Sequence, residues 1–220
     1  MPTRIDGLIR EKKIKAVIFD LDGTMVDNNP YHLASWRQYL QELGIEISEE
    51  NYRKHINGRT NKDAIEYIYQ RTMSNEEAMV YTLQKEAIYR KLYAPHIKPV
   101  NGLIELIKKI HKKNLPMGIA TSGIQVNIDF LFEHIPIQSY FSAIINSAHI
   151  KKGKPDPEIF LTTAAALKVQ PSACLVFEDA AVGVRAAKEA GMYIVALTTT
   201  QTATELAAAD LIMNNFTTLL

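Results

Sequence analysis

An apolar run that ends on two closely spaced carboxylates constrains this chain more than any other feature. Residues 15–24 read Lys-Ala-Val-Ile-Phe-Asp-Leu-Asp-Gly-Thr, so four apolar residues lead directly to Asp20 and Asp22. Such a run is typical of a buried strand that delivers both acids to its carboxyl end. Burying two carboxylates is costly unless a cation or a shared proton compensates, so the segment indicates a chemical site. Asp-x-Asp-Gly alone also fits a turn or a calcium-loop fragment, and the preceding strand argues against that alternative.

Size and charge set wider limits. The 220 residues suffice for one substantial core, or for a core with a small accessory domain, and an apolar fraction of 47% favours a globular protein. With 25 basic against 24 acidic residues the net charge is +1, so no overall field favours nucleic acid or an anionic membrane. We therefore expect no nucleic-acid or membrane partner, and a monomer or weak homodimer.

The expected compartment follows from segments that the sequence lacks. The first 13 residues mix charges without the apolar centre of a signal peptide, and no apolar run approaches the roughly 20 residues of a membrane span. The single cysteine, Cys174, excludes an internal disulfide, and its apolar neighbours predict a small core residue. We expect a cytoplasmic protein.

The hydrophobic pattern divides the chain into a helical block and an alternating block. Helical periodicity covers residues 30–43, 48–56, 61–72 and 75–93, with capping signals at Thr60 and Ser74. Beyond residue 99, the predicted strands are 117–121, 143–146, 175–178, 194–198 and 211–213, and the predicted helices are 102–113, 126–133, 157–167, 182–190 and 203–208. Alternating strands and helices predict an α/β fold with a doubly wound, mainly parallel sheet.

The helical block is predicted to be an insertion, because it falls directly after the first strand. We expect an α/β core domain of residues 1–28 and 98–220, and an α-helical cap domain of residues 29–97. The two connectors, at 27–29 and 96–100, predict a hinge between the domains.

Polar residues end several of the predicted strands. Open parallel sheets bind ligands beyond the carboxyl ends of their strands, so these residues are expected to meet. They are Asp20 and Asp22, then Thr121-Ser122-Gly123, then Glu178-Asp179, with Lys154 on a loop. Converging carboxylates repel each other unless a hard divalent cation neutralises them, and a few oxygen ligands suit Mg²⁺. The predicted metal ligands are Asp20, Asp22, Glu178 and Asp179; alternatively, the last two acids cap the following helix.

These residue types also suit the transfer of a phosphoryl group. Asp20 is predicted to be the nucleophile, or alternatively a metal ligand alone, and Asp22 to protonate the leaving oxygen and then deprotonate water. Thr121 or Ser122 offers a hydroxyl group to a phosphate oxygen, and Lys154 offers a point charge. The structural alternatives are an ordinary turn and helix N-cap at residues 121–123 and a solvated charge run at residues 151–154.

The order of these segments resembles the four motifs of the haloacid dehalogenase superfamily, in its phosphatase and phosphomutase branch. The motifs are Asp20-Leu-Asp-Gly-Thr24, Thr121-Ser122, Lys154-Pro155 and Glu178-Asp179, and they span nearly the whole chain. The resemblance implies a Rossmann-like core whose helical cap closes over it. It also implies Asp20 as nucleophile, Asp22 as acid/base and backbone-carbonyl metal ligand, Thr121 as phosphate ligand, Lys154 as charge stabiliser, and Asp179 with Glu178 as holders of Mg²⁺.

The cap carries the weaker part of the resemblance. Tyr31-His32 and Trp36 resemble cap residues of β-phosphoglucomutase. The cap arginine of that enzyme has no clear match, since Asn61 falls at its place and Arg59 is offset. A lysine and an asparagine that help it to hold a second phosphate are replaced by Ile124 and Gln125. A mutase must grip two phosphates, so these losses favour a phosphatase.

The candidate substrate-binding residues divide between core and cap. They are Thr121, Ser122, Gly123, Lys154, His32 and Arg59. Among the cap residues, Trp36 is predicted to lie in the core of the cap, and His32 lies either on a helix surface or in the site. Lys62 and Lys85 are, like Arg59, within reach of a substrate anion in principle, but are predicted to be solvated.

The leading hypothesis is an Mg²⁺-dependent phosphatase that hydrolyses a small phosphate monoester, a sugar or polyol phosphate, through an aspartyl phosphate. A phosphomutase of the β-phosphoglucomutase type is the nearest rival. A phospho-accepting signalling domain uses similar groups but lacks the Asp-x-Asp-Gly-Thr arrangement and the insertion. A catalytically silent binding module is the last alternative, and the intact pair Asp20 and Asp22 argues against it.

Overall fold

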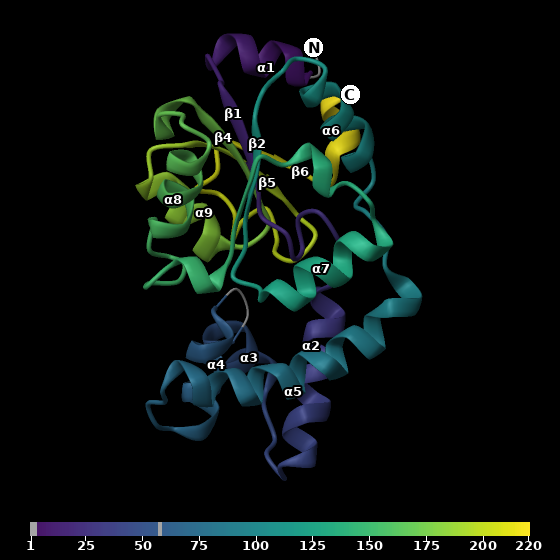
Figure 1. The fold of residues 1–220 in the computed structure, drawn as a ribbon, viewed down its shortest axis with the longest axis vertical. Helices are drawn as coiled ribbons and strands as arrows, with labels where there is room; N and C mark the ends of the chain where they lie inside the picture. Colours follow the sequence, from purple (N-terminus) through teal and green to yellow (C-terminus); the bar gives the residue numbers. More distant parts are fainter. Residues whose placement is uncertain (1–3, 57–58) are drawn as a thin grey trace.

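One six-stranded parallel sheet forms the centre of the computed structural model, which describes residues 4–56 and 59–220 (Figure 1). The strands are β1 (Ala16–Phe19), β2 (Met117–Ala120), β3 (Ala143–Ile145), β4 (Cys174–Glu178), β5 (Tyr193–Leu197) and β6 (Leu211–Met213). Their order in the sheet is β3-β2-β1-β4-β5-β6, and every neighbouring pair is parallel. The prediction of a doubly wound α/β core is confirmed.

Helices cover both faces of the sheet. One face carries α1 (Ile5–Glu11), α6 (Leu103–His111) and α7 (Gln125–His134), and the other carries α8 (Glu158–Ala166) and α9 (Ala181–Glu189) (Figure 1). The alternation of side chains along β1 divides the two cores, since Val17 and Phe19 pack with the first set of helices and Ala16 and Ile18 with the second. All four β1 residues are fully buried, which is why the strand is an uninterrupted apolar run.

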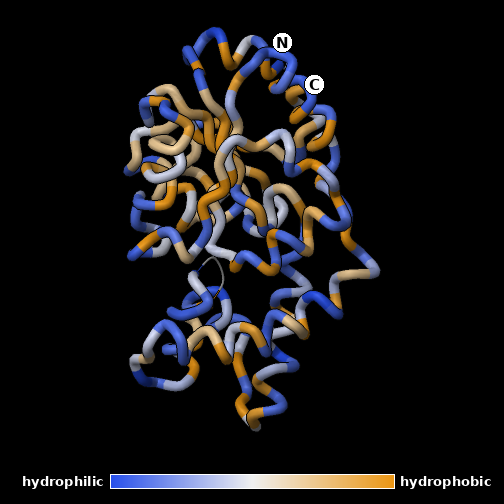
Figure 2. The backbone as a smooth tube through the Cα atoms, in the orientation of Figure 1, coloured by the Kyte–Doolittle hydropathy of each residue, from blue (hydrophilic) through white to orange (hydrophobic). Residues whose placement is uncertain are grey.

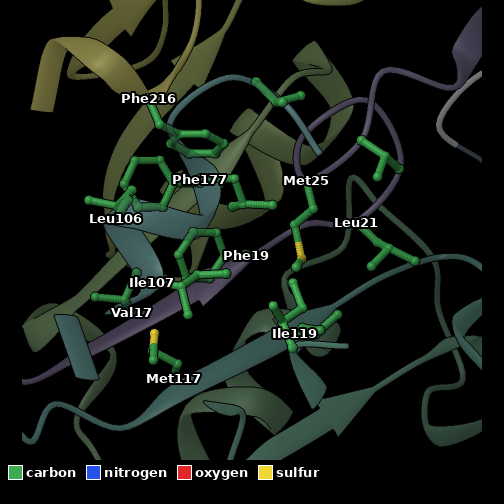
Figure 3. Close-up of a cluster of buried hydrophobic side chains, with 14 of the residues drawn as sticks. Val17, Phe19, Leu21, Met25, Leu106, Ile107, Met117, Ile119, Phe177 and Phe216 are labelled. Atoms are coloured by element: carbon green, nitrogen blue, oxygen red, sulfur yellow. The ribbon is translucent and has the colours of Figure 1, made fainter. Parts of the chain in front are cut away.

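Aromatic rings fill the first of these cores. Figure 2 shows hydrophobic chain concentrated along the central strands, and Figure 3 shows Phe19, Phe177 and Phe216 gathered beside Val17 and Met117. The Phe19 and Phe177 rings stack with centroids 5.0 Å apart, and Phe216 meets Phe177 edge-on at 5.1 Å. These contacts fix neighbouring strands β1 and β4 against each other. On the opposite face Cys174 is buried, as predicted.

A helical insert follows β1. It consists of α2 (Asn29–Glu42), α3 (Glu49–His55), α4 (Asn61–Tyr69) and α5 (Asn75–Tyr93). Figure 1 shows the insert below the core, next to α7. Thr60 and Ser74 accept N-cap hydrogen bonds from the backbone N–H groups of Asp63 and Glu77, both at 3.2 Å, as their sequence signals predict. The insert has its own hydrophobic cluster, in which Trp36 is 3% exposed.

The two connectors of the insert lie side by side. The backbone N–H of Val100 donates to the carbonyl of Met25 at 2.9 Å, and Val26 forms an antiparallel bridge with Pro99. The chain therefore leaves and re-enters the core at one place, which is the geometry that a hinge needs. The domain limits at 28/29 and 97/98 stay a prediction.

Two local predictions differ from the structure. Helix α1 is absent from the sequence-based assignment because only two of its residues, Ile5 and Leu8, are buried, too few for a clear period. The predicted helix 203–208 is wrong, since these residues form turns. There Asp210 accepts a hydrogen bond from the backbone of Ile194 at 2.8 Å, so the chain must rejoin β5 before a second helical turn forms.

Short 3-10 helices complete the secondary structure of the described residues. They are η1 (Ala94–His96), η2 (Gln138–Tyr140), η3 (Ser147–His149), η4 (Pro171–Ala173) and η5 (Phe216–Leu219). Among the helices that the structure describes, none has both the length and the apolar character that a bilayer crossing requires.

Candidate active site

The order of the strands brings the predicted residues together. Asp20 directly follows β1, Thr121 directly follows β2, and Glu178 ends β4. Because β1 lies between β2 and β4, these three positions are neighbours at one edge of the sheet, and the backbone N–H of Asp20 donates to the carbonyl of Phe177 at 2.9 Å. The chain runs outward in opposite directions from β1 and β4, so this edge is a topological switch point where a crevice is expected.

Three carboxylates and one lysine form the centre of the site. Asp20, Glu178 and Asp179 are each at most 5% exposed, and one oxygen of each lies within 4.8 Å of the others. The buried ammonium of Lys154 donates to Asp20 Oδ1 at 2.6 Å and to Glu178 Oε2 at 2.8 Å. Three ionised acids against one ammonium leave two negative charges, and oxygen ligands suit a hard divalent cation. The donor set therefore fits Mg²⁺.

The pKa values of the cluster follow the same charge imbalance. Burial, and then the neighbouring charge of Glu178, raise the pKa of Asp20 well above its usual value and that of Asp179 to about 7. Burial opposes the charged form of Lys154 as well, but Asp20 and Glu178 outweigh it and raise the lysine pKa. The acids are thus held in an environment that resists their full ionisation, a resistance that a bound cation relieves.

Asp22 has different surroundings from Asp20. Its Oδ1 accepts a hydrogen bond from Asn28 Nδ2 at 2.5 Å and lies 3.4 Å from His32 Nε2. On the other side of the ring, Lys85 Nζ lies 3.0 Å from His32 Nδ1. Because an ammonium only donates, Nδ1 of a neutral ring accepts and Nε2 carries the proton toward Asp22.

The hydrogen bonds around Asp22 also decide its ionisation. Burial tends to raise its pKa, but His32 and Asn28 stabilise the carboxylate, and the net shift is downward. The Asp22 side chain is not part of the three-acid cluster. Any contact of Asp22 with a metal through its backbone carbonyl stays a prediction.

A glycine turn lets the loop after β1 approach the acid cluster. Gly23 has a φ of +82°, and a Cβ atom there would lie 2.0 Å from Asp179 Oδ2. The next residue, Thr24, is buried and donates from Oγ1 to Asp179 Oδ1 at 3.0 Å. Asn29 Nδ2, on the first turn of α2, lies 3.4 Å from Asp179 Oδ2. The loop thereby orients Asp179 through both carboxylate oxygens.

The segment after β2 leaves a polar atom without a protein partner. Thr121 Oγ1 accepts from the backbone N–H of Gly123 at 2.9 Å, whereas Ser122 Oγ is buried and unpartnered among the described residues. All three residues line the pocket that contains the acids. The alternative of a plain helix N-cap fails here, because Ile124 is the N-cap of α7 and makes no side-chain cap bond. A buried hydroxyl without a partner fits a ligand oxygen.

The strand end at Glu178 meets the following helix closely. Glu178 Oε1 accepts from the backbone N–H of Ala180 at 3.2 Å, and a Cβ atom on Gly183 would lie 2.1 Å from the Glu178 carboxyl carbon. Ala180 itself is the N-cap of α9 and offers no side-chain bond. The two predicted roles of Glu178 are therefore compatible, since it touches the helix start with one oxygen and Lys154 with the other.

Cap residues close the pocket over the acids. The cap side of the lining consists of His32, Trp36, Tyr52, Ile56, Arg59, Asn61, Ala64, Lys85 and Glu86. Of the cationic candidates, Arg59 lines the pocket and is exposed, as predicted, whereas Lys62 points to Asn75 at 2.8 Å and is not among the lining residues.

Lys85 corrects a prediction. It is 1% exposed rather than solvated, and its ammonium pairs with Glu86 at 2.9 Å and lies 4.9 Å from the centre of the Trp36 ring. The interior of the cap contains a charged pair that sequence reasoning did not anticipate. Trp36 packs in the core of the cap, as predicted, and it also lines the pocket, which the prediction did not include.

Several residues of the site escaped sequence analysis. They are Asn28, Asn29, Glu86 and Asn127. Asn28 and Asn29 lie in the expected connector, and their position directly after the loop that carries Asp20 and Asp22 was the one available signal. Ile124 and Gln125 lie outside the pocket lining, and Gln125 instead bonds Asp129 and Asn146 at 2.8 and 2.9 Å.

Comparison with known proteins gives consistent matches. Residues 17–197 match the family model described as haloacid dehalogenase-like hydrolase. The chain is 29% identical over 181 residues to a fructose-1-phosphate phosphatase of Escherichia coli (strain K12), covering 82% of this chain and 95% of the relative. It is 32% identical over 191 residues to a β-phosphoglucomutase of Bacillus subtilis (strain 168), and the match covers 83% of this chain and 82% of that enzyme. The structure of a hydrolase from Entamoeba histolytica superposes with a TM-score of 0.81 at 33% identity, and the match covers 92% of this chain and 94% of that one.

Proposed function

The chain belongs to the haloacid dehalogenase-like hydrolase family, and from this premise we propose that it is an Mg²⁺-dependent phosphatase of a sugar or polyol phosphate that works through an aspartyl phosphate. The observation that carries the proposal is the meeting of Asp20, Lys154 and Asp179 at one edge of the sheet, with Asp22 and the unpartnered Ser122 hydroxyl in the same pocket. The family match and the phosphatase relative support phosphoric monoester hydrolysis, and the substrate class is the finer proposal.

In the first half-reaction, Asp20 attacks the phosphorus atom. Lys154 occupies Oδ1 of Asp20, and Oδ2 makes no hydrogen bond within residues 4–56 and 59–220, so Oδ2 is the attacking atom. The bond from phosphorus to the ester oxygen breaks as the bond to Oδ2 forms, and the leaving oxygen takes a proton from Asp22. The phosphate dianion raises the pKa of Asp22 on arrival, because like charges disfavour ionisation, and this supplies the protonated form.

In the second half-reaction, the deprotonated Asp22 removes a proton from water. The water oxygen bonds to phosphorus, the bond to Asp20 Oδ2 breaks, and inorganic phosphate leaves. Asp22 is ionised at this stage because it has given its proton to the leaving oxygen, and it can therefore accept a proton from water. Thr121 and Ser122 hydroxyl groups and nearby backbone N–H groups hold the phosphate oxygens.

Asp20, Glu178 and Asp179 are the residues that would hold Mg²⁺, with the Asp22 carbonyl added by the family resemblance. When bound there, Mg²⁺ neutralises the two excess charges of the cluster and polarises the phosphoryl oxygens.

The phosphomutase alternative has support from the β-phosphoglucomutase relative. A mutase must hold a second phosphate, and the groups at the corresponding positions are otherwise engaged here. Asn61 donates to Glu86 at 3.0 Å, and Ile124 and Gln125 lie outside the pocket lining. These observations favour the phosphatase.

Phosphate release from p-nitrophenyl phosphate and a panel of sugar and polyol phosphates, with Mg²⁺ or with EDTA, tests the proposal. We expect Mg²⁺-dependent release that Asp20→Asn lowers by at least about a thousandfold. Asp129→Asn, an exposed acid on α7, is the matched control and should retain wild-type rates. Isomerisation of a sugar 1-phosphate without phosphate release would overturn the phosphatase, and a phospho-adduct that lasts for hours would favour signalling.

A further inference from the structure

Glu86 on α5 is a pocket-lining acid that the proposed mechanism does not use. It is 2% exposed and lies on the cap side of the pocket. Three side chains donate to it. Oε1 accepts from Lys85 Nζ at 2.9 Å and from Asn61 Nδ2 at 3.0 Å, and Oε2 accepts from Asn127 Nδ2 at 2.7 Å. Two of the donors belong to the cap, and Asn127 belongs to α7 of the core.

The hydrogen bonds of Glu86 place a carboxylate among the donors that an anion would need on this part of the wall. A phosphate group has only acceptor oxygens at neutral pH, so it needs N–H or O–H groups, or cations, to bind. Here the ammonium of Lys85 and the amide N–H groups of Asn61 and Asn127 already point at a carboxylate. A second phosphate on the substrate would have to share these donors with the buried carboxylate of Glu86, whose negative charge repels it.

The same hydrogen bonds fix what the wall offers instead. Because one N–H of the Asn61 amide is held by Glu86, the orientation of the side chain is fixed, and its Oδ1 accepts no hydrogen bond within the described chain. The corresponding oxygen of Asn127 accepts from Arg90 at 2.8 Å. An acceptor oxygen on the wall binds a hydroxyl group and not a phosphate.

The charges of the cap wall point in the same direction. Burial alone would raise the pKa of Glu86, but Lys85, His32 and Asn127 together hold it below its usual value, so Glu86 is ionised and cancels the charge of Lys85. Among the described lining residues, the remaining lysine and arginine side chains are Arg59, which is exposed, and Lys154, which is engaged with Asp20 and Glu178. The buried pair of Lys85 and Glu86 inside the cap wall is thus neutral as a pair.

We propose that Glu86 is a specificity-determining residue that excludes substrates carrying a second phosphate and selects those whose remainder is uncharged and rich in hydroxyl groups. This inference rests on the proposed phosphatase function and narrows its substrate class. The aromatic rings of Trp36 and Tyr52 on the same wall supply an apolar surface for the C–H faces of such a substrate.

Competition experiments test the role of Glu86 directly. Fructose 1-phosphate and fructose 1,6-bisphosphate compete with p-nitrophenyl phosphate at matched free Mg²⁺, and the ratio of their inhibition constants measures discrimination, whether or not either is hydrolysed. Whichever phosphate of the bisphosphate enters the reacting centre, the other meets the cap. We expect the wild-type enzyme to bind the bisphosphate at least about tenfold more weakly.

Glu86→Gln supplies the decisive variant. The neutral amide releases Lys85 from its ion pair. We therefore expect the ratio of the two inhibition constants, bisphosphate to monophosphate, to fall by about tenfold, mainly because the bisphosphate binds more tightly. The matched control is Glu77→Gln on the same helix, where the exposed carboxylate pairs with Arg71; it should keep the wild-type ratio. Circular dichroism checks that each variant folds. If Glu86→Gln does not fold, Asn61→Arg, which adds donors beside Glu86, should narrow the ratio in the same way.

The results separate this inference from the proposed function. Equal binding of the two esters by the wild-type enzyme, or a ratio that the folded variant leaves unchanged, overturns the role of Glu86 while leaving the phosphatase intact. Absence of p-nitrophenyl phosphate hydrolysis overturns the phosphatase. In that case titration calorimetry measures the dissociation constants of the two fructose esters. We then expect the same weaker binding of the bisphosphate, by at least about tenfold, and the same narrowing in Glu86→Gln, and equal binding overturns the role of Glu86.

Discussion

The acid cluster predicts that a neutral substitution stabilises the metal-free protein. Asp179 is the best test, because it is 2% exposed and its pKa is raised to about 7, first by burial and then by Glu178. The usual value is 3.8. Since the folded-state pKa lies above the unfolded value, the folded protein prefers the protonated acid. The contribution of Asp179 to stability is therefore full below about pH 4 and is lost as the pH rises through about 7.

The expected magnitude follows from this shift. A rise of about 3 pKa units corresponds to roughly 4 kcal/mol, of which about 2–3 kcal/mol falls between pH 5 and pH 8. In Asp179→Asn the amide oxygen still accepts from Thr24, but its N–H group replaces the oxygen that faces Asn29 Nδ2, at a cost of about 1 kcal/mol. We expect the variant to be more stable than wild type by about 2–3 kcal/mol at pH 8 without metal.

Urea unfolding followed by far-ultraviolet circular dichroism, in EDTA at pH 5 and pH 8, measures this difference. The advantage of Asp179→Asn should grow from pH 5 to pH 8, and saturating Mg²⁺ should reverse it, because only the wild-type site binds the cation tightly and gains stability from it. Asp129→Asn, at an exposed position, should follow wild type within about 0.5 kcal/mol. A variant less stable than wild type at pH 8 in EDTA, or a difference independent of pH, would refute the reasoning.

Three further outcomes are expected. Asp22→Asn should slow phosphate release by about a hundredfold or more, as for the loss of a positioned acid/base, and unchanged release would remove Asp22 from that role. Lys154→Met should lower the free energy of unfolding by about 3–5 kcal/mol at pH 8 in EDTA, because it leaves Asp20 and Glu178 buried without their shared partner; urea unfolding measures this, and a loss under 1 kcal/mol would contradict the pairing. If residues 27–29 and 96–100 form a hinge, small-angle scattering should show a smaller radius of gyration with a bound phosphate analogue than without one, and an unchanged radius counts against the hinge.

The core of the site was predictable because it depends on strand ends. Three of the four motifs follow a short apolar run, and a parallel sheet brings the carboxyl ends of its strands to one edge whatever the loops between them do. Lys154 is the exception, because it lies on a loop. Asp20 and Thr121 are 101 positions apart, yet their strands β1 and β2 are neighbours. The helical insert was predictable for a related reason, since its period and its caps at Thr60 and Ser74 are local features.

The polar interior of the cap was not predictable in the same way. Lys85 and Glu86 have the composition of a solvated helix face, and no local pattern marks them as buried. Their burial comes from long-range packing: Lys85 lies beside His32 and Trp36 of α2, and Glu86 reaches Asn127 of α7, which is 41 positions away. A single sequence does not encode such pairings in its periodicity, so a buried ion pair has the same pattern as an exposed one.

An insertion at this point in the chain gives the cap direct influence over Asp22, the proposed acid/base. Asn28, the fully buried residue before α2, donates one amide hydrogen to Asp22 at 2.5 Å and the other to the hydroxyl of Tyr89 on α5 at 2.6 Å, while its oxygen accepts from the N–H of Gly23 at 3.0 Å. His32, on α2, approaches the same oxygen of Asp22. Because every one of these partners belongs to the catalytic loop, to the connector or to the cap, the hydrogen bonding of Asp22 depends on where the cap lies. The geometry of Asp22, the proposed general acid/base, and the proposed selection of substrates by Glu86 therefore depend on the same helices.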